Sequence, residues 1–224
     1  MAKIIVTGSQ GLLGKEACKY LGKTHTIKKL DLKLGHDLTD EKFVKLWFKK
    51  NKGDYLINCF ALNDHVDNDR KKNTLFDFPL KSFHEYLDIN VITLFSVCRE
   101  FAKNNKSGSI INFSSIYGIV SPMPTLYDGS HKDIAYCVSK SGVINLTKYL
   151  AAHLAPNFRI NCIVPGGVLF NQKKDFIKKY STITPMKRMM KKTELNGILD
   201  YLCSSSSAYM TGSILVLDGG YTIW

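Results

Sequence analysis

The sequence predicts one α/β domain over residues 1–224: a doubly wound, mainly parallel sheet of six or seven strands with helices on both faces. Short apolar runs alternate with longer segments of helical periodicity, and the first run ends at a glycine-rich turn. Strands that are buried on both faces read as continuous apolar runs, as these do. The expected strands are 3–7, 26–30, 55–59, 109–113, 159–164 and 213–217. The expected helices are 12–21, 41–51, 80–104, 134–154 and 191–202.

Composition narrows the class of protein. A hydrophobic fraction of 45% and a charged fraction of 22% are typical of a folded globular chain. The net charge is +12, yet only four of the 31 basic residues are Arg, the residue that nucleic-acid readers favour. We therefore expect an anionic small-molecule substrate and no nucleic-acid partner. We also expect a cytoplasmic protein without membrane contact or a metal site, because there is no apolar span or secretory signal and the six cysteines are scattered.

A glycine-rich segment, Gly8-Ser9-Gln10-Gly11-Leu12-Leu13-Gly14, follows the first strand and opens the first helix. Glycines at this place let the backbone approach a pyrophosphate at the helix N-terminus, as in Rossmann-type domains. Asp31 stands at the end of the second strand, 20 residues after Gly11. A carboxylate at that distance accepts from the adenosine ribose hydroxyls and repels a 2′-phosphate, which favours NAD(H) over NADP(H).

Tyr136 and Lys140 are four residues apart on an expected helix, so their side chains share one face. A neighbouring ammonium favours the phenolate, and we expect it to lower the pKa of Tyr136 so that the phenol can transfer a proton. Ser114 and Ser115 follow the strand 109–113 and should lie at the carboxyl edge of the sheet, where open α/β sheets bind their ligands.

Taken together, these motifs resemble the short-chain dehydrogenase/reductase family nearly from end to end. The resemblance implies that Ser115 orients the substrate oxygen, that Tyr136 is the general acid/base, and that Lys140 holds the nicotinamide ribose and tunes the phenol. It implies in addition that Asn90 holds a water of a proton relay. It assigns Asp37 and Leu38 to the adenine, and the backbone of Val168 to the carboxamide.

The cofactor-binding residues implied by the resemblance are Gly8, Ser9, Gln10, Gly11, Leu12, Leu13, Gly14, Asp31, Asp37, Leu38, Asn58, Ala61, Tyr136, Lys140, Pro165, Gly166 and Val168. Two departures from the family pattern affect this set. The glycines follow a Gly-x-x-Gly-x-x-Gly spacing, and Asn58-Cys59-Phe60-Ala61 replaces the usual Asn-Asn-Ala-Gly. The four catalytic positions are unaffected.

The long segment between Ser115 and Tyr136, with the ending 218–224, resembles reductases of bacterial surface-sugar pathways of the flagellin modification protein A type. The expected reaction is interconversion of a secondary alcohol and a ketone on a phosphorylated or nucleotide-linked sugar. Tyr117 and Arg188, the latter in a lysine-rich stretch, are the candidate substrate contacts. A 3-oxoacyl-[acyl-carrier-protein] reductase is the alternative within the enzyme class. A non-catalytic cofactor-sensing or nucleic-acid-binding protein is the alternative from another class.

Two further expectations concern architecture. Only five residues separate Asp31 from Asp37, fewer than a parallel crossover needs, so the helix and the regular third strand that relatives carry there should be missing. The expected helices 80–104 and 134–154 carry apolar residues beyond a single face, which predicts a homodimer or homotetramer.

Overall fold

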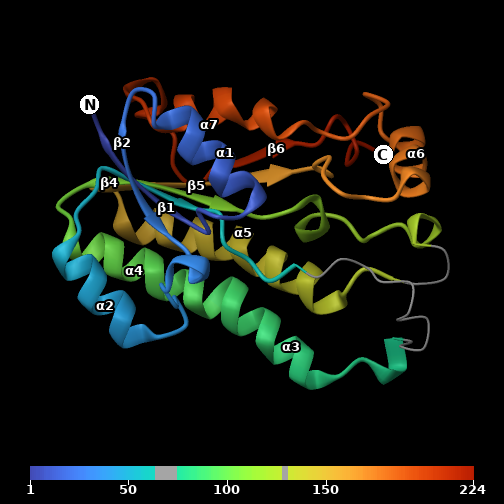
Figure 1. Cartoon of the computed structure of the whole chain (residues 1–224), viewed down its shortest axis with the longest axis horizontal. Helices are drawn as coiled ribbons and strands as arrows, with labels where there is room; N and C mark the ends of the chain where they lie inside the picture. Colours follow the sequence, from blue (N-terminus) through green and yellow to red (C-terminus); the bar gives the residue numbers. More distant parts are fainter. Residues whose placement is uncertain (64–74, 128–130) are drawn as a thin grey trace.

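The computed structural model describes residues 1–63, 75–127 and 131–224, so residues 128–130 of the long segment before Tyr136 lie outside the described residues. Six parallel strands form one sheet in the order β2-β1-β3-β4-β5-β6 (Figure 1). The predicted doubly wound α/β fold is confirmed. The strands are β1 Lys3–Thr7, β2 Thr26–Leu30, β3 Tyr55–Asn58, β4 Gly108–Phe113, β5 Phe158–Pro165 and β6 Ile214–Leu217.

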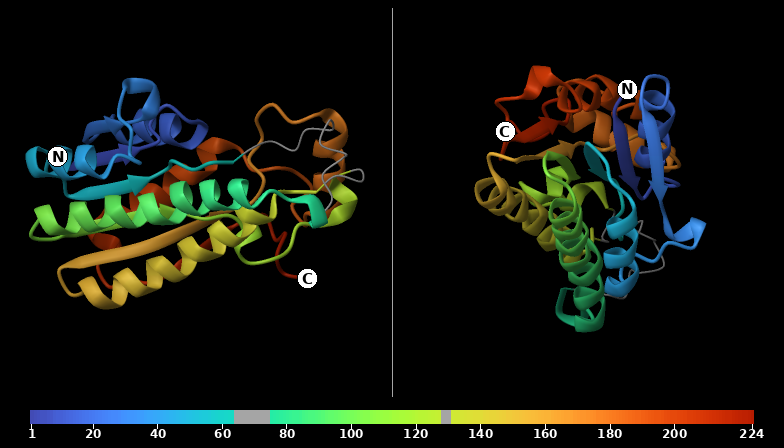
Figure 2. Two further views of the ribbon diagram at one scale, coloured as in Figure 1. Left: turned by 90° about the horizontal axis from the view of Figure 1, so that it is seen from below. Right: turned by 90° about the vertical axis from the view of Figure 1, so that its left-hand side faces the viewer.

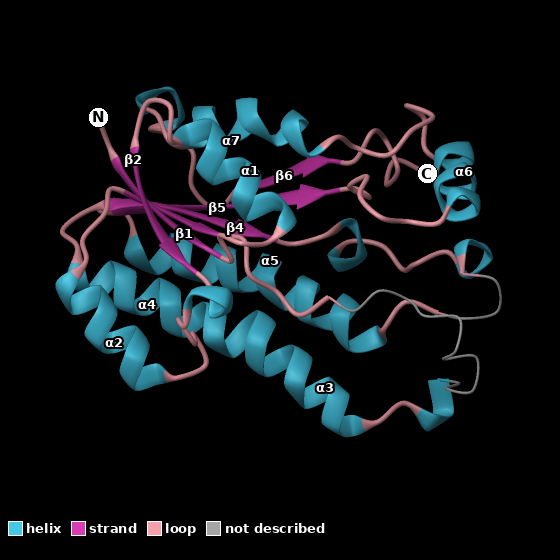
Figure 3. Ribbon diagram, in the orientation of Figure 1, coloured by secondary structure: helices cyan, strands magenta, loops and turns pink. Residues whose placement is uncertain are grey.

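Helices cover both faces of this sheet. Helices α1 and α7 lie on one face, and α2, α3, α4 and α5 lie on the other, whereas α6 lies beyond the carboxyl ends of β4, β5 and β6 (Figure 3). Side chains alternate between the two layers: Ile4 and Val6 join the core under α1 and α7, and Ile5 joins the opposite core. The helices are α1 Leu12–Leu21, α2 Glu41–Lys50, α3 Leu80–Leu87, α4 Leu94–Asn104, α5 Ile134–Leu154, α6 Lys174–Ile183 and α7 Asn196–Leu202.

No strand follows β2 in the link to α2, as the sequence predicts. Between Asp31 and Asp40, all of which the structure describes, the chain forms one 3₁₀ turn at Leu32–Leu34 and no strand. Strand β2 is therefore the edge strand. Asp37 and Leu38 lie in the loop that leads directly into α2.

Three helical features differ from the expectation. The expected helix 191–202 consists of a 3₁₀ turn at Lys192–Leu195 followed by α7, which begins at Asn196. The helix 80–104 is continuous, but residues Asp88–Thr93 form a π-helical turn between α3 and α4. Figure 2 shows the combined helix running alongside α5. Helix α6 was not expected, although Phe176, Ile177 and Tyr180 have helical spacing on its inner face. Among the described residues, no helix is long and apolar enough to cross a membrane.

Candidate active site

The glycine-rich turn lies where the strand order reverses. The connection from β1 leads outward to β2, whereas that from β3 leads the other way to β4, so the loops after β1 and β3 separate at the carboxyl edge. Gly8 has a φ of 61°, and a Cβ added to it would lie 2.4 Å from the backbone nitrogen of Phe60. A Cβ on Gly14 would lie 2.1 Å from the carbonyl oxygen of Gly8. The close approach of these backbones therefore requires glycine at both positions.

Asp31 ties the end of β2 to this turn. Its Oδ2 accepts from the backbone N–H of Gln10 at 2.8 Å, and its Oδ1 accepts from that of Lys33 at 2.9 Å. The hydroxyl of Ser9, in the same turn, is buried without a hydrogen-bond partner. A glycine cradle, a carboxylate at the end of β2 and a spare hydroxyl together fit a nicotinamide dinucleotide.

The candidate catalytic residues meet at the end of β4. Ser115 begins the 3₁₀ turn Ile116–Gly118, and α5 carries Tyr136 and Lys140 against it. Two hydrogen bonds join helix to strand: Lys140 Nζ donates to the carbonyl of Phe113 at 3.0 Å, and Ser114 Oγ donates to the carbonyl of Lys140 at 2.7 Å. Ser115, Tyr136 and Lys140 are thus brought together as the sequence predicts.

The electrostatics of Tyr136 differ from the expectation. The side chain is 7% exposed, and burial raises its pKa to about 12, although the hydrogen bond with Ser115 acts in the opposite direction. Burial also lowers the pKa of Lys140 to about 8, with a smaller contribution from Lys132. The expectation of a lowered phenol pKa is corrected here, because burial disfavours the phenolate more than the hydrogen bond with Ser115 favours it.

Asp133 fixes the start of α5 and was missed at the sequence level. Its Oδ1 accepts from the backbone N–H groups of Ala135 at 2.8 Å and Tyr136 at 3.3 Å. An Asp immediately before an apolar helical run is the signal that indicates such a cap. The cap sets the position at which Tyr136 enters the site.

Asn90 braces the loop after β3. Its Oδ1 accepts from the backbone N–H of Leu62 at 2.7 Å, and its Nδ2 donates to the carbonyl of Leu62 at 3.0 Å and to Ser139 Oγ at 2.9 Å. Leu62 directly follows Ala61, the expected cofactor contact. The side chain of Asn90 therefore connects the π-helical turn, this loop and α5.

Asn58 has an internal role. Its Oδ1 accepts from Thr7 Oγ1 at 3.0 Å, and its Nδ2 donates to Asn112 Oδ1 at 2.9 Å; Asn112 in turn donates to Thr147 Oγ1 at 3.0 Å. This buried series of hydrogen bonds joins β1, β3, β4 and α5. The side chain of Asn58 is thus engaged inside the sheet, and any contact with a cofactor falls to its backbone.

The remaining expected cofactor residues lie around the same edge. Asp37 accepts from Thr39 and is exposed, whereas Leu38 is buried in the core. Pro165 ends β5, and the backbone N–H of Gly166 donates to the carbonyl of Leu217 at 2.8 Å. Val168 pairs with Met190 in a short parallel bridge, which holds the segment after β5 in place.

The two candidate substrate residues are both engaged within the chain. The hydroxyls of Tyr117 and Tyr127 lie 2.6 Å apart, and burial raises the pKa of both phenols. Arg188 forms a bidentate ion pair with Glu194, with N···O distances of 2.7 and 2.6 Å. A substrate phosphate would have to displace the carboxylate of Glu194 to bind the same guanidinium N–H groups. The sequence pattern around Arg188 did not indicate this ion pair.

The glycine cradle yields a direct test. In Gly14→Ala, the new methyl group has to push the backbone of Gly8 away, so the dissociation constant for NADH should rise at least about tenfold, or about 1.4 kcal/mol. Fluorescence titration of NADH measures it. Gly197→Ala is the matched control, since an added Cβ there meets nothing within 4 Å. Unchanged NADH binding in Gly14→Ala would remove this turn from the cofactor site.

Comparison with known proteins places the chain in a family. The family model described as "Enoyl-(Acyl carrier protein) reductase" matches residues 2–222. Post-translational flagellin modification protein A of Campylobacter coli is 28% identical over 251 aligned residues, covering 97% of both chains. D-arabinitol 2-dehydrogenase (ribulose-forming) of Candida albicans is 34% identical over 161 residues, which span 66% of this chain and 55% of that protein.

A solved structure extends the likeness to three dimensions. A short-chain dehydrogenase from Leptospira borgpetersenii serovar Hardjo-bovis with bound NAD⁺ superposes with a TM-score of 0.87 at 32% identity, covering 98% of this chain and 92% of that one. The chain therefore belongs to the short-chain dehydrogenase/reductase family and is an oxidoreductase that acts on CH–OH groups.

Proposed function

We propose that this protein interconverts a secondary alcohol and a ketone on a phosphorylated or nucleotide-linked sugar, with NAD(H) as the preferred cofactor. The observation that carries the chemistry is the group of Ser115, Tyr136 and Lys140 at the end of β4, beside the glycine cradle. A nicotinamide dinucleotide, when bound, supplies or accepts the hydride.

The residues of the chain handle the proton and the position of the substrate. Ser115 holds the substrate oxygen near the phenol of Tyr136, whose pKa its side chain acts to lower. In ketone reduction, Tyr136 donates its proton to the carbonyl oxygen; in alcohol oxidation, it takes that proton back. Since its pKa is raised to about 12, the phenol is protonated at neutral pH and ready for reduction, and oxidation should accelerate as pH rises. Lys140 orients the nicotinamide ribose, and Asn90, whose side-chain amide bonds Leu62 and Ser139, holds a water of the relay.

The preference for NAD(H) follows from Asp31. Each carboxylate oxygen accepts one backbone N–H and keeps a further lone pair, which can accept from a ribose hydroxyl but repels a phosphate. The Leptospira relative was solved with NAD⁺. The glycine turn 8–14 would hold the pyrophosphate, and the segments at 37–38, 61 and 165–168 would surround the adenine and nicotinamide ends.

The sugar substrate is inferred from the relatives and from charge. One relative is named for the post-translational modification of flagellin, and the other for the dehydrogenation of D-arabinitol to ribulose. Helix α6 and the segment after it carry an excess of lysines at the carboxyl side of the sheet. A cationic surface near the site favours the approach of anionic substrates.

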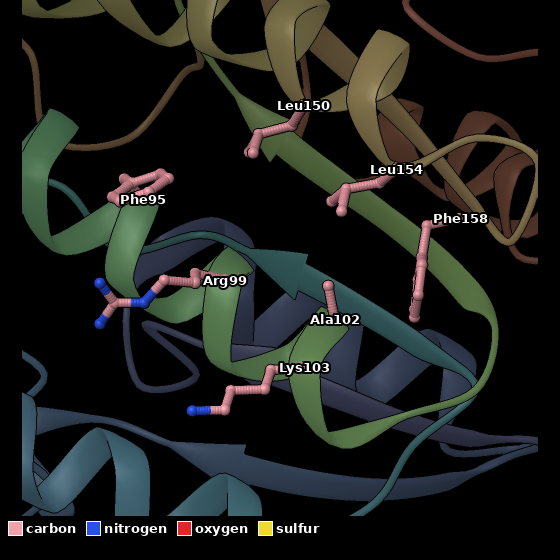
Figure 4. Close-up of a pocket in the computed structure, with 7 residues that line it drawn as sticks. All are labelled: Phe95, Arg99, Ala102, Lys103, Leu150, Leu154 and Phe158. Atoms are coloured by element: carbon pink, nitrogen blue, oxygen red, sulfur yellow. The ribbon is translucent and has the colours of Figure 1, made fainter.

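We further propose a cytoplasmic homo-oligomer that pairs through α4 and α5. The six cysteines are all free thiols, as in a reducing compartment. A largely apolar groove lies between these helices, lined by Phe95, Arg99, Ala102, Lys103, Leu150, Leu154 and Phe158 (Figure 4). Such a surface between two exposed helix faces suits a two-fold contact. Light scattering of the purified chain measures the assembly.

A substrate panel tests the proposed function. The purified protein is assayed with NADH against a nucleotide-linked keto sugar, a keto-sugar phosphate, a neutral ketose and a 3-oxoacyl thioester. We expect the highest kcat/KM for the anionic sugars, and a decline with added salt for them alone, because salt screens charge-guided approach. Equal rates for the neutral ketose would contradict the anionic substrate, and a preference for the thioester would favour a 3-oxoacyl-carrier-protein reductase.

Cofactor preference is tested with Asp31→Asn. This change removes the charge and keeps one amide oxygen, which can accept from either Gln10 or Lys33 but not from both, whereas Ala would accept from neither and loosen the glycine turn further. We expect NADH to bind about tenfold or more weakly and NADPH to bind more tightly, since hydrogen bonds to a charged group are worth about 1.5–3 kcal/mol. Wild-type protein that binds NADPH more tightly than NADH would overturn the preference.

A further inference from the structure

A second ammonium group lies against Tyr136. The Nζ of Lys132 is 4.4 Å from the centre of the Tyr136 ring, closer than the Nζ of Lys140, which is 5.7 Å from it. Lys132 precedes α5 and is absent from the Tyr-x-x-x-Lys pattern. We propose that Lys132 is a positioning residue that stabilises the phenolate of Tyr136 from the ring face and thereby sets the pH range in which Tyr136 can act as a base. This inference rests on the proposed role of Tyr136 as the acid/base.

The contact suits a phenolate better than a phenol. A cation over an aromatic face is attracted by the ring quadrupole, whose face is negative, and ionisation of the hydroxyl adds a full negative charge to the ring system. Lys132 is half-buried and Tyr136 is buried, so solvent screens their interaction less than it screens a surface pair. The effect of Lys132 should therefore appear in the pH dependence of the reaction.

The ammonium is held in place from two sides. Lys132 Nζ donates to Asn63 Oδ1 at 2.6 Å, which anchors its tip to the loop after β3. Its backbone is joined to Asp133, whose carboxylate caps α5. The geometry over the ring is thus set by the loop and the helix start together, and it does not depend on the side chain of Lys140.

Lys140 is less suited to this task in alkaline solution. Its ammonium donates to the carbonyl of Phe113, and burial lowers its pKa to about 8. Lys140 therefore loses its charge within the range in which oxidation should accelerate. The ammonium of Lys132 at the ring face would stabilise the phenolate independently of the charge of Lys140.

Other titratable groups around Tyr136 come from every neighbouring element. On α5 and its cap these are Lys140, Cys137 and Asp133; Tyr86 of α3 packs edge-on with ring centres 6.2 Å apart. Tyr127 approaches from the loop before α5, and its pKa is raised chiefly by burial. Lys132 is the cation nearest to the ring among the residues that the structure describes.

The test compares the pH dependence of kcat/KM in both directions for the wild type, Lys132→Met and Lys132→Arg. In Lys132→Met, the acidic limb of alcohol oxidation should move to higher pH by roughly half to one unit, so oxidation below that limb falls about three- to tenfold. Ketone reduction at the same pH should change by the same factor, because the equilibrium constant fixes the ratio of the two directions when cofactor binding is unchanged; the dissociation constants of NAD⁺ and NADH are measured alongside to check that condition. Lys132→Arg, which keeps a cation at the ring face, should restore the wild-type limb.

Lys148→Met is the matched control. It removes the same charge from an exposed position of α5 and should leave the profile unchanged. An unmoved acidic limb for Lys132→Met, or a loss of the same size at every pH, would overturn the inference while leaving the proposed function intact. Wild-type protein without NAD(P)-dependent turnover of any substrate in the panel would instead refute the proposed function.

Discussion

The site depends on the contact between the start of α5 and the end of β4. Lys140 Nζ donates to the carbonyl of Phe113, and Ser114 Oγ donates to the carbonyl of Lys140. These two hydrogen bonds fix α5 to the end of β4 next to Ser115 and Tyr136. A Cβ on Gly118 would lie 2.8 Å from the carbonyl oxygen of Lys140, so the turn after β4 packs closely on the helix. This contact places Ser115 beside Tyr136.

A second constraint joins this contact to the cofactor side. The buried series of hydrogen bonds from Thr7 through Asn58 and Asn112 to Thr147 crosses from β1 to α5, and Asn90 fixes the loop after β3 to the same helix. A buried polar group that lacks a hydrogen-bond partner destabilises the folded state, so this series of hydrogen bonds specifies the relative positions of the strands and helices it joins. These hydrogen bonds therefore fix the glycine turn relative to Ser115, Tyr136 and Lys140, as the proposed joint transfer of a hydride and a proton requires.

Much of this arrangement could be predicted, because local patterns determined it. Helices α1 and α5 have the predicted ends, and the short link after Asp31 correctly indicated a missing crossover, since chain length alone forbids it. The π-helical turn could not be predicted, because hydrophobic spacing does not distinguish it from a regular helix. The pairing of Arg188 with Glu194, the internal role of Asn58 and the raised pKa of Tyr136 all depend on burial and partners that only the folded chain defines.

The central claim is that the phenol of Tyr136 carries the proton, and Tyr136→Phe tests it most directly. Phe keeps the ring and its edge-on contact with Tyr86 but removes the hydroxyl. Tyr149→Phe, at an exposed position of the same helix, is the control. The account predicts that NADH binding in Tyr136→Phe stays within a factor of about two while turnover falls about 10²–10⁴-fold. Turnover within a few-fold of the wild type would contradict it.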